Sequence, residues 1–120
     1  MPNQAQSPKT KYDLEERTAK FAEEVIELVK KIPETAITRS IISQLVRSSG
    51  SIGANYMEAD GAESKKDFRH KIAICKKEAK ETRHWLRLLA KAYSKKQEEC
   101  RKLWKEVQEL TLIFSAILRK

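Results

Sequence analysis

The residue pair with the clearest potential for chemistry is Glu81 and His84, which stand three positions apart in a stretch with helical periodicity. Helical bundles that bind two iron or manganese ions use such a Glu-x-x-His pair on two helices and add two further glutamates. This chain has the pair once, because its other histidine, His70, has no glutamate three residues earlier. We therefore predict no metal site and no cofactor, and a metal-binding bundle is kept as the third alternative for the function.

Nucleophilic side chains are present without the partners that would activate them. The serines between positions 48 and 51 have no histidine close in sequence, and two histidines on one charged helix are poor candidates for a catalytic triad. Cys75 and Cys100 form no Cys-x-x-Cys motif. On antiparallel helices joined near Ser94 they would lie roughly 20 Å apart, which is too far for a disulfide. We expect two free thiols and a protein that is not an enzyme.

Positive charge is concentrated in the third predicted helix. The chain has a net charge of +8, and residues 63–95 contain eleven basic and four acidic side chains. Six basic residues recur there at helical spacing, and we call this set the basic stripe: Arg69, Lys76, Lys80, Arg83, Arg87 and Lys91. Such a stripe is typical of a surface that binds the phosphate backbone of a nucleic acid. The alternative is a solvated face that keeps the protein soluble.

Polar residues also interrupt the apolar face of the second predicted helix. They are Arg47, Asn55 and Glu58. Buried polar groups normally find partners, and Arg47 could pair with Glu58, or with Glu78 or Glu81 across the bundle. We expect these five residues to form a structural polar network, with a ligand-binding role as the alternative.

The elements that position these residues follow from apolar residues that recur at steps of three and four, which predict helices. The predicted ranges are about 13–32, 37–61, 65–93 and 95–119. Links of a few residues make neighbouring helices antiparallel, so we predict an all-α fold, an antiparallel up-down-up-down four-helix bundle. Ser64 with Asp67, and Ser94 with Gln97, are predicted to cap the third and fourth helices.

The domain organisation is simple at this length. Residues 1–11 are polar and contain two prolines, so we expect a disordered tail, followed by one bundle domain over residues 12–120. No apolar run is long enough to cross a membrane, and the first residues lack the apolar segment of a secretory signal. The expected location is cytoplasmic, without membrane contact.

The stretch from Ser48 to Gly53 looks unsuited to a helix, because it holds three serines and two glycines. The apolar period nevertheless continues through it, from Leu45 to Ile52 and Tyr56. We therefore predict one continuous helix in which the small residues Ser48, Ser51 and Gly53 allow close approach of a neighbouring backbone.

Several motifs in this chain resemble those of a known family. They are Arg17 with Phe21, Gln44 to Ser48, Ser51-Ile52, Asn55, Glu58-Ala59, Ser64 to Phe68, and Glu81 to Leu86. Together they resemble the four-helix bundle proteins encoded by intervening sequences in bacterial 23S rRNA genes. The resemblance covers roughly residues 13–119, and the chain departs from it at Gly50 and Gly53, where many relatives have alanine or proline.

The resemblance implies a homopentamer with a basic surface that meets nucleic acid, and it implies no catalytic residues. A relative in this fold is the accessory variability determinant of diversity-generating retroelements, a basic pentamer that binds a reverse transcriptase and its template RNA. The leading hypothesis is a non-catalytic, oligomeric bundle whose basic stripe binds RNA or DNA phosphates with little sequence specificity. A protein-interaction adaptor, such as an accessory subunit of a reverse transcriptase, is the second hypothesis.

Overall fold

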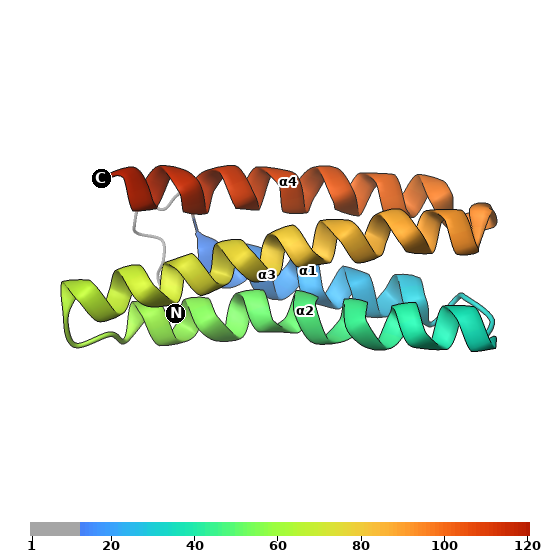
Figure 1. Cartoon of the computed structure of the whole chain (residues 1–120), viewed down its shortest axis with the longest axis horizontal. Helices are drawn as coiled ribbons and strands as arrows, with labels where there is room; N and C mark the ends of the chain where they lie inside the picture. Colours follow the sequence, from blue (N-terminus) through green and yellow to red (C-terminus); the bar gives the residue numbers. More distant parts are fainter. Residues whose placement is uncertain (1–12) are drawn as a thin grey trace.

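The structure, a computed structural model, describes residues 13–120 and contains four α-helices that alternate in direction (Figure 1). The helices are α1 (Leu14–Val29), α2 (Ala36–Asp60), α3 (Lys65–Ala92) and α4 (Gln97–Arg119). No strand occurs in this part of the chain. The predicted all-α, up-down-up-down four-helix bundle is confirmed. The expected tail at residues 1–11 lies outside the described residues.

Apolar faces of all four helices meet in one core. Phe21 of α1, Leu45 of α2, Leu86 of α3 and Phe114 of α4 are each 1% exposed or less. Helix α3 packs along both α2 and α4, while α1 packs mainly on α2 and more loosely on α4. The bundle is 44 Å long, close to the roughly 42 Å expected of the 28-residue α3 at 1.5 Å per residue. A surface along α3 therefore extends over nearly the whole length of the bundle.

Two helix boundaries differ from the prediction. Helix α1 ends at Val29 rather than near Ile32, because the amides of Lys31 and Ile32 bond to carbonyls three residues back and tighten the chain into a turn. Helix α4 begins at Gln97 rather than at residue 95, because Ser94–Lys96 forms a 3₁₀ turn. The predicted side-chain cap from Ser94 does not form there.

The other helix starts are capped by their own side chains. The amide of Glu16 donates to Asp13 Oδ1 at 3.3 Å, and the amide of Asp67 donates to Ser64 Oγ at 3.0 Å. Thr35 caps α2, where it accepts a hydrogen bond from the amide of Thr38. Each cap satisfies an amide that the first turn of a helix leaves without a partner.

The small-residue stretch lies within the unbroken helix α2, as predicted. At Gly53 a Cβ atom would lie 3.1 Å from Oγ1 of Thr18 on α1, so the glycine allows close approach of these two helices. At Gly50 a Cβ atom would meet nothing within 4 Å. Ser48 is buried, and its Oγ accepts a hydrogen bond from Oγ1 of Thr82 on α3 at 2.9 Å. Contact with the neighbours therefore explains Ser48 and Gly53 and does not explain Gly50.

Candidate nucleic-acid interface

The basic stripe lies on one side of α3, and most of its side chains reach solvent. Arg69, Lys80, Arg87 and Lys91 are exposed, and the other two members are half-buried. Among residues 13–120, none of the six makes an ion pair with a carboxylate. The positive charge of the stripe is therefore available to a partner from outside the chain.

Arg83 connects the stripe to α4. Its guanidinium donates a hydrogen bond to the side-chain carbonyl of Gln108. Its Cζ atom also lies 5.8 Å from the centre of the Trp104 ring, a geometry in which a cation is attracted to the face of an aromatic ring. The basic stripe thus lies on the side of α3 that faces α4.

Acidic residues in the middle of α3 face the opposite neighbour. Glu81 pairs with Nη2 of Arg47 on α2 at 2.6 Å, and Glu78 lies 3.5 Å from Nη1 of the same arginine. Both are among the four acidic residues that lie between positions 63 and 95, together with eleven basic ones. In the structure they turn toward α2 and are paired there, so the two charge types occupy different sides of the helix.

The environment of Glu81 favours its charged form. Partial burial acts to raise its pKa, but hydrogen bonds from Trp85 and Arg47, together with the charge of Arg47, outweigh this and lower the pKa below its ordinary value. Glu81 therefore remains a carboxylate at neutral pH and serves as a partner for Arg47.

The structure divides the expected polar network into separate contacts. Arg47, Glu78 and Glu81 come together as predicted. Glu58 instead pairs with Lys71 at 2.7 Å, and Asn55 donates to the backbone carbonyl of Ser51 on its own helix at 2.9 Å. These partners account for the polar residues of α2 by contacts within the bundle.

The two cysteines are free and buried. Burial raises the pKa of Cys75 to about 12 and that of Cys100 to about 11. Both side chains are thus neutral thiols at physiological pH, whereas the nucleophilic form of cysteine is the thiolate. Neither thiol has the environment of an activated nucleophile.

The Glu81–His84 pair does not assemble a metal site in the described residues. No group of three or more histidine, cysteine, aspartate or glutamate side chains in residues 13–120 could hold a metal ion. His84 is exposed and lies edge-on to Trp85, with ring centres 4.9 Å apart. Over the same residues, no helix is long and apolar enough to cross a membrane.

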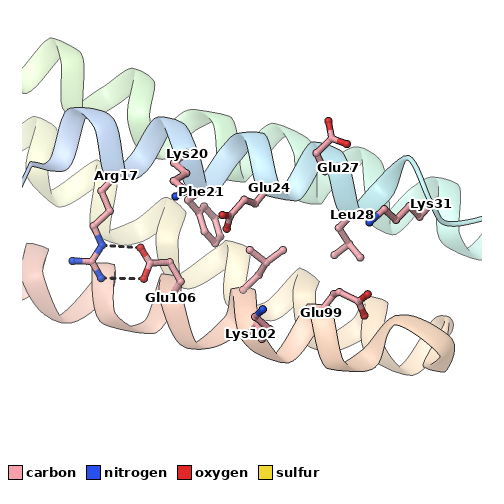
Figure 2. A pocket seen from close by; sticks show the side chains of 11 residues that line it. Arg17, Lys20, Phe21, Glu24, Glu27, Leu28, Lys31, Glu99, Lys102 and Glu106 are labelled. Atoms are coloured by element: carbon pink, nitrogen blue, oxygen red, sulfur yellow. Dashed lines mark hydrogen bonds and ion pairs between the residues drawn. The ribbon is translucent and has the colours of Figure 1, made fainter. Parts of the chain in front are cut away.

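A groove of about 520 Å³ runs between α1 and α4, and Figure 2 shows the residues that line it. Its charged lining consists of four basic and four acidic side chains: Arg17, Lys20, Lys31, Lys102, Glu24, Glu27, Glu99 and Glu106. Arg17 lies across this groove and contacts Glu106 at 2.7 Å and 3.0 Å (Figure 2), which raises the pKa of the arginine. This groove has balanced charge, in contrast to the basic stripe.

Fold and charge distribution together define a class of protein: an antiparallel four-helix bundle with a cationic stripe on α3 that makes no ion pairs within residues 13–120. The family model described as "23S rRNA-intervening sequence protein" matches residues 10–116. The chain belongs to this family.

A solved structure supports this assignment. It is the crystal structure of a Bacteroides thetaiotaomicron protein from the S23 ribosomal protein family, described as a protein with unknown function. It is 30% identical to this chain, covers 89% of this chain and 99% of its own, and superposes with a TM-score of 0.78. No curated protein sequence matches the chain significantly.

Sequence reasoning missed the contribution of α4 to the candidate interface. Trp104 and Gln108 contact Arg83, but neither residue was predicted to belong to the interface. Both follow Cys100 at steps of four, which is the signal that could have placed them on one side of α4. Their pairing with the basic stripe depends on the register between α3 and α4.

Proposed function

We propose that the protein is a non-catalytic nucleic-acid-binding bundle whose basic stripe contacts phosphates of RNA or DNA. The observation that carries this proposal is the set of six cationic side chains on one side of α3 without ion-pair partners among residues 13–120. Arg17 and Arg47, which lie outside the basic stripe, differ from it because each already has a carboxylate partner. Membership of a family named after 23S rRNA agrees with a nucleic-acid partner.

The geometry of the stripe suits a phosphate backbone. Arg69 and Lys91 are 22 positions apart on one helix, so the stripe extends over roughly 33 Å at 1.5 Å per residue. Phosphate contacts release condensed counterions, which makes affinity fall as salt rises. Contacts to phosphates also position a nucleic acid without reading its bases. The expected binding is salt-dependent and only weakly sequence-specific.

The test compares two triple variants that remove the same charge from different surfaces. The first, Arg69→Gln/Lys80→Gln/Lys91→Gln, changes exposed members of the basic stripe. The second, Lys20→Gln/Lys31→Gln/Lys102→Gln, changes exposed lysines that line the α1–α4 groove (Figure 2). Filter binding of RNA and DNA is measured over a range of salt concentrations, and circular dichroism checks that all three proteins are folded.

We expect the stripe variant to lose affinity at low salt and its log–log salt slope to become shallower by about 2 to 3, since each lost phosphate contact removes about 0.7 to 0.9. The groove variant is expected to keep a slope close to that of the parent. Absence of binding by the parent at low salt, or an equal loss in both variants, contradicts the proposal.

We also propose that the bundle acts as a homo-oligomer, with the pentamer implied by its family resemblance as the expected state. Two large apolar residues of α2 support a contact surface, because Val46 and Met57 are 38% and 52% exposed. Gly50 lies between them at helical spacing and has open space where a side chain would be. A neighbouring subunit on this side of α2 would cover all three positions and leave the basic stripe of α3 accessible.

A further inference from the structure

A hollow of about 430 Å³ opens between α3 and α4, next to the basic stripe. Its apolar lining includes Leu86, Ala90 and Cys100, and one wall is Trp104. Leu86 and Cys100 are 0% and 2% exposed, so they form a floor rather than a rim. Most of the hollow is thus apolar, although the surface around it is cationic.

Two arginines at this hollow supply positive charge on both of its sides. Arg87 comes from α3 and is a member of the basic stripe, and Arg101 comes from α4. Arg101 pairs with Glu98 at 3.3 Å, but both side chains are more than half exposed, and such surface pairs contribute little. Either arginine can therefore turn toward an anionic group at the edge of the hollow.

Trp104 lines this hollow and also contacts Arg83. On α3 the lining residues 86–90 follow Arg83, and on the antiparallel α4 the lining residues 97–101 precede Trp104. Arg83 covers the tryptophan at 5.8 Å from the ring centre. The indole of Trp104 is half-buried and contacts Arg83, and it has an apolar space beside it. A planar ring can stack on such a surface.

We propose that the α3–α4 hollow binds an unpaired nucleobase, so that the preferred ligand of the basic stripe is single-stranded nucleic acid. The base would stack against Trp104 over the apolar floor, and its flanking phosphates would contact Arg87 and Arg101. A duplex keeps its bases stacked on one another and cannot place one in the hollow without unpairing it. This inference rests on the proposed function and names the ligand class of the same face.

The test uses the unmodified protein and separates the contribution of the bases to affinity from that of the phosphates. Affinities are measured at low salt for oligothymidylate, oligouridylate, a duplex of equal length, and an abasic deoxyribose-phosphate chain of equal length. The abasic chain has the same phosphates and no bases. One stacked base is expected to make oligothymidylate bind about 5- to 150-fold more tightly than the abasic chain, and the duplex is expected to bind more weakly than either single strand.

Three variants locate the base contact. Trp104→Leu keeps an apolar side chain and is expected to reduce oligothymidylate binding to the level of the abasic chain, whereas Trp104→Phe keeps a ring and most of the difference. The third variant, Trp85→Phe, retains Trp104 as its single tryptophan. We expect oligothymidylate to quench the fluorescence of Trp104 and the abasic chain to leave it unchanged.

The outcomes distinguish this inference from the proposed function. Equal affinity for oligothymidylate and the abasic chain, or tighter binding of the duplex, overturns the base-binding site and leaves the phosphate-binding face standing. A base preference that persists unchanged in Trp104→Leu overturns the assignment to this hollow. Failure of every ligand to bind overturns the proposed function itself.

Discussion

The two glycines within α2 provide a stringent test of the packing, because the structure predicts opposite results for the same substitution. Glycine within a helix costs about 1 kcal/mol relative to alanine. At Gly50 the added methyl group would meet nothing within 4 Å. We therefore expect Gly50→Ala to raise the free energy of unfolding by about 1 kcal/mol, and the midpoint temperature by about 3–6 °C for a domain of this size.

At Gly53 the same methyl group would lie 3.1 Å from Oγ1 and 3.4 Å from Cβ of Thr18. Thr18 has little freedom to move, since it is 1% exposed and its hydroxyl donates to the carbonyl of Leu14 at 2.6 Å. Overpacking of this kind costs about 1–3 kcal/mol. After the gain in helix propensity of about 1 kcal/mol, Gly53→Ala is expected to be neutral or to destabilise by up to about 2 kcal/mol.

Urea denaturation followed by circular dichroism measures both variants, and the Thr18→Ala background supplies the control. Removing the hydroxyl of Thr18 relieves the closest contact, so Gly53→Ala should cost less in that background than in the parent. Destabilisation by Gly50→Ala without a change in oligomer mass, or equal effects of the two substitutions, would refute the reasoning. A loss of stability at Gly50 accompanied by a loss of oligomer mass would show that a neighbouring subunit fills the open space.

Two further predictions concern the ion pairs and the assembly. The pKa of Glu81 is lowered in the fold, so its contribution to stability is present above the ordinary value of 4.5 and is lost as the pH falls through the lowered pKa. In urea titrations at several pH values, the stability difference between parent and Glu81→Gln should shrink on acidification, and a constant difference would contradict the pairing with Arg47. Light scattering of the parent should give a multiple of the 13.9 kDa subunit mass, five-fold for the expected pentamer, and a monomer would contradict the proposed assembly.

The helices were predictable because each has one continuous apolar face whose period survives local irregularities. The face of α2 continues through Ser49 and Ile52, and both residues are buried. Helix ends were less predictable, because they depend on single hydrogen bonds. Ser94 followed by Gln97 fits a capping motif, yet Ser94 begins a 3₁₀ turn that connects α3 to α4, and Gln97 is the first residue of α4.

The candidate interface was predictable only in its α3 half. Helical spacing placed the basic stripe on one side of α3, but the spacing does not reveal which neighbour each side meets. Trp104 belongs to the interface because α4 lies beside Arg83 in a register that brings their side chains together. That register results from packing between helices, and a pattern within one helix contains no information about it.

The position of α3 between α2 and α4 explains how one helix can carry both an acidic and a basic side. Glu81 and the nearly buried Glu78 lie beside Arg47 of α2, which pairs with both. Because both carboxylates are paired with Arg47, they do not compete for the arginines and lysines on the other side of α3. The α1–α4 groove, by contrast, is lined by equal numbers of acidic and basic residues (Figure 2), so its carboxylates would repel an incoming phosphate. A high net charge alone would not distinguish these two surfaces, whereas the local balance of acidic and basic residues does, and it favours the α3–α4 face for an anionic polymer.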